Sequence, residues 1–148
     1  MYARLVADGG CPLRPGVAQI IASAGAHGQI LAIATTTSRE NVDALLSPAL
    51  GPTWAGLFKA IVAGDDVATK KPAPDVYLNV LAALGLPANS CLAFEDSRNG
   101  LLAARSAGIE VVVARSMYFD DETFDGASCV LRDLSELALE IPAICGGP

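Results

Sequence analysis

Residues 91–97 read CLAFEDS, a short apolar run that leads directly into two adjacent acids. Such a run is typical of a strand buried on both faces of a parallel sheet. Ligands of open α/β sheets bind beyond the carboxyl ends of their strands. The carboxylates of Glu95 and Asp96 repel each other unless a cation joins them, and Mg²⁺ prefers oxygen ligands of this kind. The alternative is a solvated loop acid next to a helix cap at Asp96 or Ser97.

Apolar runs and helical patterns alternate on both sides of this stretch. Besides 91–94, we expect strands at 29–34, 61–63, 110–114 and 128–131. We expect helices at 17–26 with Pro15 in the first turn, from a capping box at 37–40 to about 46, and at 75–84, 98–107 and 133–139. This alternation with short connections predicts an α/β fold, a doubly wound and mostly parallel Rossmann-like sheet. One core domain over 1–148 with a frayed tail at 142–148 is expected.

Composition narrows the possible partners. The 148 residues carry a formal net charge of −6 and no basic patch, which argues against a nucleic-acid partner. No apolar stretch approaches the roughly 20 residues of a membrane span, and the first residues lack the apolar segment of a signal peptide. A cytoplasmic location is expected, with an organelle stroma as the alternative. The single histidine, His27, and four scattered cysteines make a zinc site improbable.

Two further segments have the chemistry of a phosphate site. The hydroxyl run 35–38 lies between an expected strand and an expected helix, whose free N–H groups attract anions. N-capping alone is the simpler role for such a run. Lys71 precedes Pro72, which favours an extended backbone, and Pro74 opens the next helix. A lysine positioned in this way can neutralise a phosphate, whereas Lys70 is expected to be a solvated side chain.

The order of these segments resembles a known family. The segments IAT at 33–35, KPAPD at 71–75 and EDSRNG at 95–100 are similar to the second, third and fourth motifs of the haloacid dehalogenase-like (HAD) hydrolases. The residues of these segments are most similar to the motifs of the branch that contains CbbY, beta-phosphoglucomutase and phosphoglycolate phosphatase. LRPGV at 13–17 resembles the segment by which that branch re-enters its core domain after a helical cap, and 1–12 would then be a remnant of the linker.

The resemblance implies a Mg²⁺-dependent phosphatase that acts on a small sugar phosphate through a phosphoaspartate. It assigns phosphoryl binding to Thr35 with Thr36, and charge neutralisation to Lys71. Asp96 would be a Mg²⁺ ligand, and Glu95 a ligand or its close support. Thr35 and Lys71 would thus form the catalytic set, in which the protein mainly positions groups and neutralises charge.

The first motif of the family, Asp-x-Asp-Gly-Thr, is absent. Its nearest counterpart is VADGG at 6–10, where Val6 would occupy the position of the nucleophile and Asp8 is a poor substitute. No nucleophile is therefore assigned. The missing strand normally lies at the centre of the sheet, between the strands that end at Thr35 and Asp96, and the cap is missing too.

Four interpretations follow from this departure. The chain is the C-terminal core of a phosphatase, inactive alone; a non-catalytic module that binds phosphate or Mg²⁺; a phosphomutase of the same family; or a structural remnant. The two strands that flank the gap would present unpaired edges, so self-association through them is expected. The sugar phosphate is not identified, since the cap that usually selects it is absent.

Overall fold

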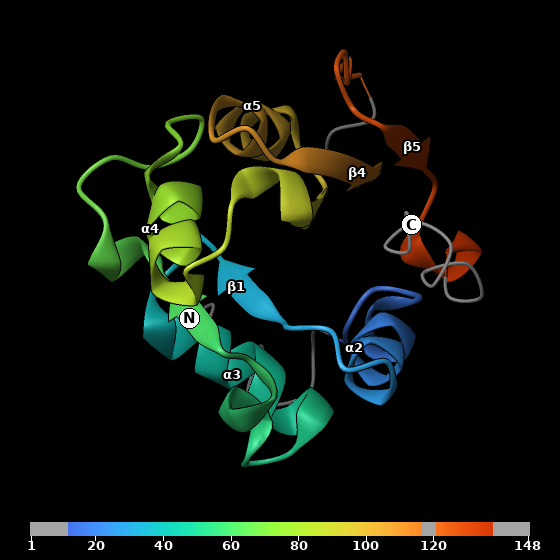
Figure 1. Ribbon diagram of the computed structural model, residues 1–148. Coiled ribbons are helices and arrows are strands. Elements are labelled where there is room, and N and C mark those ends of the chain that lie inside the picture. Colours follow the sequence, from blue (N-terminus) through green and yellow to red (C-terminus); the bar gives the residue numbers. More distant parts are fainter. Residues whose placement is uncertain (1–11, 117–120, 138–148) are drawn as a thin grey trace.

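A computed structural model of the chain describes residues 12–116 and 121–137. Its helices and strands are α2 (Val17–Ala26), β1 (Ala32–Ala34), α3 (Arg39–Leu50), β2 (Ala60–Val62), α4 (Asp75–Leu84), β3 (Leu92–Glu95), α5 (Arg98–Ser106), β4 (Glu110–Ala114) and β5 (Cys129–Leu131) (Figure 1). Short 3₁₀ turns lie at Trp54–Leu57, Gly64–Asp66, Ala88–Ser90 and Leu134–Glu136. Within these ranges, every helix falls short of the length and apolarity needed to cross a membrane.

The strands are parallel, as the alternating pattern predicted, and the described ones form two sheets. β1 pairs with β2, while β3, β4 and β5 form the second sheet in that order. In Figure 1, β1 lies apart from β4 and β5. β1 and β3 are not hydrogen-bonded to each other, which leaves the break at the position where the missing central strand was expected.

Side-chain alternation along the strands assigns each helix to a face. Ala32, Ala34, Val62 and the odd-numbered residues 93, 111 and 113 belong to one core cluster, together with α4 and α5. The intervening residues face the other way: Ile33 and Ile61 pack with α3, whereas 92, 94, 112 and 114 pack with α2 and the turn at Leu134–Glu136. The fold is therefore a doubly wound α/β arrangement, because both faces are covered and successive side chains point to opposite faces.

Several element boundaries differ from the expected ones. β1 begins at Ala32 rather than 29, because Gly28 adopts a positive φ of 68° and the Gln29 N–H closes the end of α2 on the Ala24 carbonyl at 2.9 Å. α3 continues to Leu50 rather than 46, since Leu50 packs against the cluster of Val42, Leu46 and Trp54.

The remaining differences lie near the two ends. α2 spans Val17–Ala26 as expected, but Pro15 lies before its first turn, because Gly16 between them has a φ of 88° and a Cβ there would overlap the Leu134 backbone. The helix expected at 133–139 is a 3₁₀ turn at Leu134–Glu136 within the described residues, with Asp133 capping it. Positions 1–11 and the expected tail at 142–148 lie outside the described residues.

Candidate active site at the strand ends

The hydroxyl run forms a compact turn between β1 and α3. The Thr35 N–H donates to the Val62 carbonyl at 3.0 Å and so continues the pairing of β1 with β2. Thr35 Oγ1 accepts from the Thr37 N–H at 3.2 Å, and Ser38 is the N-cap of α3, accepting from the Asn41 N–H at 3.2 Å. The cap is therefore Ser38, one residue later than the capping box proposed at 37–40, because the helix begins at Arg39.

Gly64 holds this turn from the neighbouring strand end. Its N–H donates to the Thr37 carbonyl at 2.7 Å. A Cβ on Gly64 would overlap the carbonyl of Thr36, so the two backbones approach each other more closely than any other residue type allows. The Thr35–Thr36 turn is thus a rigid feature placed by β2 as well as by β1.

Lys71 links the ends of the two sheets. Its Nζ donates to the Ala34 carbonyl at 3.1 Å and also to Glu95 Oε1. The Lys71 and Glu95 side chains are only 13% and 8% exposed. The Lys71–Pro72 peptide is cis, and the Ala73 N–H closes a tight turn on the Lys70 carbonyl at 3.1 Å, where the sequence indicated extended backbone.

The two adjacent acids have different environments. Glu95 is the last residue of β3 and has the same parity as Ala93, so its side chain points to the face covered by α4. There its Oε1 accepts from Tyr77 Oη and Lys71 Nζ. A Cβ on Gly100 would overlap the Glu95 carboxylate, which therefore rests directly on the first turn of α5.

Asp96 follows the strand end and is about half exposed, with 48% of its side chain accessible. Arg14 Nη1 lies 3.9 Å from Asp96 Oδ2 and donates to the Ala114 carbonyl at 3.1 Å, while Nη2 donates to the Arg115 carbonyl. Ser97 caps α5 by accepting from the Gly100 N–H at 3.2 Å. Of the two cap residues that the sequence allowed, Ser97 is the one used.

A divalent cation fits these residues only in part. In the described ranges, no three His, Cys, Asp or Glu side chains gather closely enough to hold a metal ion. Asp96 offers an accessible carboxylate, which suits a hard cation, whereas Glu95 already accepts two hydrogen bonds. These residues can hold Mg²⁺ through Asp96, with Glu95 in the supporting role that the resemblance left open.

The site also contains residues that the sequence reasoning did not single out. Tyr77, Arg14, Gly64 and Gly100 all contact the candidate residues, through the hydrogen bonds and close approaches described above. Sequence patterns could have indicated two of these residues, Tyr77 and Gly100. Tyr77 lies on the buried stripe of α4 with Val76 and Val80, and Gly100 occupies a helix interior, where glycine needs a packing reason.

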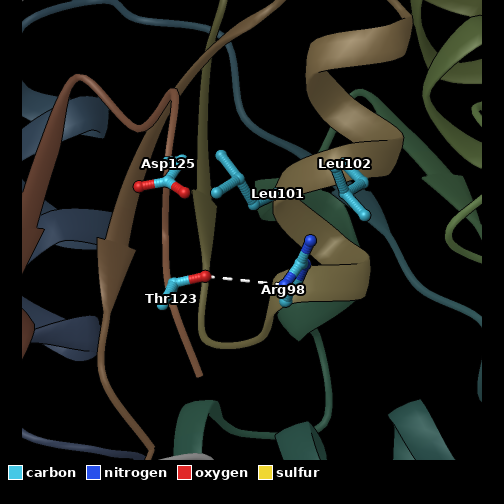
Figure 2. A pocket seen from close by; sticks show the side chains of 5 residues that line it. All are labelled: Arg98, Leu101, Leu102, Thr123 and Asp125. Atoms are coloured by element: carbon cyan, nitrogen blue, oxygen red, sulfur yellow. Dashed lines mark hydrogen bonds between the residues drawn. The ribbon is translucent and has the colours of Figure 1, made fainter. Parts of the chain in front are cut away.

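A pocket of about 150 Å³ lies beside α5. Figure 2 shows that side chains of α5 and of the segment 123–125 line it: Arg98, Leu101, Leu102, Thr123 and Asp125. Arg98 Nη1 donates to Thr123 Oγ1 at 3.5 Å. None of the candidate site residues lines this pocket.

Comparison with known proteins agrees with this geometry. Residues 2–108 match the model of the haloacid dehalogenase-like hydrolase family. Protein CbbY (plasmid) of Cupriavidus necator is 54% identical over 141 residues, which cover 95% of this chain and 56% of that protein. The crystal structure of CbbY from Rhodobacter sphaeroides in complex with phosphate has a TM-score of 0.88 at 44% identity, over 91% of this chain and 60% of that one.

A mutant of the same Rhodobacter protein has been solved in complex with xylulose-(1,5)bisphosphate, with the same score and coverage. The chain thus spans somewhat more than half the length of these relatives. The range matched by the family model, 2–108, includes Thr35, Lys71 and Glu95. On sequence, structure and family model alike, this chain belongs to the haloacid dehalogenase-like hydrolases.

Proposed function

We propose that the chain is the C-terminal core of a Mg²⁺-dependent phosphatase that acts on a small sugar phosphate through a phosphoaspartate. The observation that carries the proposal is the position of Lys71, whose ammonium joins the end of β1 to the end of β3 beside the Thr35–Thr36 turn. A cation held there is placed to neutralise a phosphoryl group at the strand ends. The phosphate and sugar bisphosphate complexes of the Rhodobacter relative support a small phosphorylated substrate.

Each residue has a distinct part in this proposal. Thr35 and Thr36 bind the phosphoryl oxygens beside the N-terminus of α3, whose dipole favours anions. Lys71 neutralises the charge that develops on the oxygens during transfer. Asp96 holds Mg²⁺, which when bound would screen the phosphoryl charge from the attacking group. The nucleophilic aspartate is not among the matched motif residues, so we propose that it comes from a further polypeptide segment.

Phosphate hydrolysis tests the catalytic part of the proposal. We expect the chain alone to hydrolyse p-nitrophenyl phosphate with Mg²⁺ at the buffer rate, because loss of the nucleophile removes most of a covalent mechanism's rate enhancement. Robust Mg²⁺-dependent turnover by the pure chain, abolished by Asp8→Asn, would contradict this and assign the nucleophile to Asp8.

Binding measurements test the site itself. Calorimetry should give a Mg²⁺ affinity in the millimolar range or weaker, about 4 kcal/mol or less, since Mg²⁺ gains little from an incomplete octahedral site. Asp96→Asn should abolish this binding, and Asp121→Asn, at an exposed position, is the control. Micromolar affinity that survives Asp96→Asn would place the metal elsewhere.

Phosphate binding without turnover is the second candidate function. It is favoured by Val6 at the position of the nucleophile and by the retained Thr35 and Lys71. Titration with inorganic phosphate should respond to Lys71→Met but not to Lys70→Met, because Lys70 is exposed and adjacent, yet makes no side-chain contact with the strand ends among those described. If a polypeptide that supplies the missing motif restores no hydrolysis, this second function is the better description.

A further inference from the structure

Tyr77 contacts both partners of the Lys71–Glu95 ion pair. Its hydroxyl donates to Glu95 Oε1, the same oxygen that accepts from Lys71. The Lys71 ammonium also lies over the Tyr77 ring, 5.1 Å from its centroid. Tyr77 itself is 6% exposed and packs in the main core cluster on α4. One side chain therefore contacts the acid by hydrogen bonding and the lysine by a cation–π interaction.

The surroundings keep the tyrosine a donor and the carboxylate in place. Burial, then the charge of Glu95, then the hydrogen bond to Glu95 raise the pKa of Tyr77 far above its ordinary value, so the phenol stays protonated. Gly100 closes the opposite side, since any Cβ there would overlap the carboxylate. Glu95 thus lies between α4 and α5 with one oxygen under the ammonium.

We propose that Tyr77 is a positioning residue for Lys71, which it fixes at the ends of β1 and β3 by holding Glu95 beneath the ammonium. The inference rests on the proposed function in one respect, that the Lys71 charge acts on a phosphoryl group. Glu95 then serves as the partner of the lysine rather than as a direct Mg²⁺ ligand, and Asp96 alone of the two acids faces the cation.

The physical reason is the length and freedom of the lysine side chain. A lysine stem loses up to about 2 kcal/mol of rotamer entropy when it is fixed, so a single carbonyl contact such as that with Ala34 is a weak restraint. Two additional contacts, one with the Glu95 carboxylate that Tyr77 holds and one with the face of the buried Tyr77 ring, reduce that freedom before any ligand arrives. Preorganised charge of this kind needs no rearrangement when a phosphoryl group binds.

NMR of the chain in complex with a polypeptide that supplies the missing first motif and strand tests the inference through the Hε methylene protons of Lys71. In the unaltered chain these protons should be inequivalent and shifted upfield by the Tyr77 ring. Tyr77→Phe keeps the ring and its volume but removes the hydroxyl. If the hydroxyl had no part in positioning Lys71, the lysine protons would therefore keep their shifts. We expect instead that Tyr77→Phe and Glu95→Gln both move these signals to the positions of a free lysine. Val76→Ala, at a fully buried neighbour, is the control for a general loosening of α4.

The outcomes separate the inference from the proposed function. Unchanged Lys71 signals in Tyr77→Phe, free-lysine signals in the unaltered chain, or an equal loss in Val76→Ala would each overturn the positioning role. Titration with inorganic phosphate is the second measurement, and Tyr77→Phe should weaken binding three- to tenfold. If Tyr77→Phe releases Lys71 but phosphate perturbs neither chain, the positioning role stands and the phosphate-binding role of Lys71 fails.

Discussion

At the scale of single residues, glycine positions show how closely the site is packed. Gly100 is the third residue of α5, a position where glycine normally weakens a helix by about 1 kcal/mol relative to alanine. It is needed there because Glu95 occupies the space of a Cβ. The requirement arises from a side chain on another element and not from the helix itself.

We therefore expect Gly100→Ala to destabilise the chain despite its better helix propensity. Displacing Glu95 from Lys71 breaks a buried ion pair, an effect on the order of 3 kcal/mol. Gly25→Ala in α2 is the matched control, because nothing lies near its Cβ, and it should stabilise by up to about 1 kcal/mol. Urea unfolding of both variants gives the comparison. Equal stabilisation by the two substitutions would show that Glu95 does not occupy this space.

The buried phenol of Tyr77 gives a second prediction, on the alkaline side. Its pKa is raised by burial and by Glu95, from an ordinary value of 10. Above pH 10 the unfolded chain therefore releases this proton while the folded chain retains it, so the free energy of unfolding falls as pH rises. Tyr77→Phe should flatten that alkaline slope. The measurement is urea unfolding between pH 9 and pH 11, and an identical slope in both chains would contradict it.

At the scale of elements, the Thr35–Thr36 turn depends on the contact between two neighbouring strand ends. The Thr35–Thr36 turn follows β1, and Gly64 follows β2 and presses on the Thr36 carbonyl. Asp66 supports the same junction, since it accepts from the Ala63 N–H at 2.8 Å and from Arg39 at the start of α3. The turn is thus supported from two elements as well as by its own cap.

Gly64→Ala should disrupt this turn. The new methyl group must displace the Thr36 carbonyl, and overpacking of this kind typically destabilises by about 1–3 kcal/mol. We expect the affinity for inorganic phosphate to fall at least tenfold, as followed by amide signals of residues 35–38. Gly56→Ala, with no atom near its Cβ, is the control and should leave phosphate binding unchanged. Normal phosphate affinity in Gly64→Ala would show that the turn does not bind the anion.

At the scale of the whole molecule, the main feature is the break between the two sheets. The Thr35 N–H bonds to β2, so by the alternation of a parallel strand the Ala34 carbonyl points the other way, where it meets Lys71. β3 likewise pairs with β4 and not with β1. The strands that border the break carry apolar residues on both faces, as buried strands do.

Unpaired strand edges are templates for pairing with other chains. We expect the isolated chain to have low solubility and to form oligomers or a molten, dye-binding state, which sedimentation and dye fluorescence would measure. The NMR and unfolding comparisons of variants therefore use the chain in complex with a polypeptide that supplies the missing strand. A second polypeptide that carries the family's first strand and the cap should improve solubility and restore Mg²⁺-dependent hydrolysis. A sharply melting monomer with well-dispersed amide signals in the absence of any partner would refute this prediction.

The sequence was sufficient for the parallel α/β fold and for the positions of most helices, because period-two and period-3.6 patterns are local properties of the chain. α4 and β4 lie at the expected residues, and two of the three segments that indicated the family lie at the ends of β1 and β3. Shorter features depended on helix caps and on neighbouring elements. The Gln29 N–H bonds to the end of α2 and so does not belong to β1. The helix expected at 133–139 is a 3₁₀ turn within the described residues.

Tertiary structure alone separated the two adjacent acids. Extension of β3 by one residue turns Glu95 toward α4, where Tyr77 and Lys71 bind it, while Asp96 faces outward near Arg14. Arg14 reaches the end of β4 across a sequence separation of 100 residues, and no local pattern encodes such a contact. The residue types at the site are a property of the sequence, but the partner of each charge is decided when helices and strands that are distant in the chain pack together.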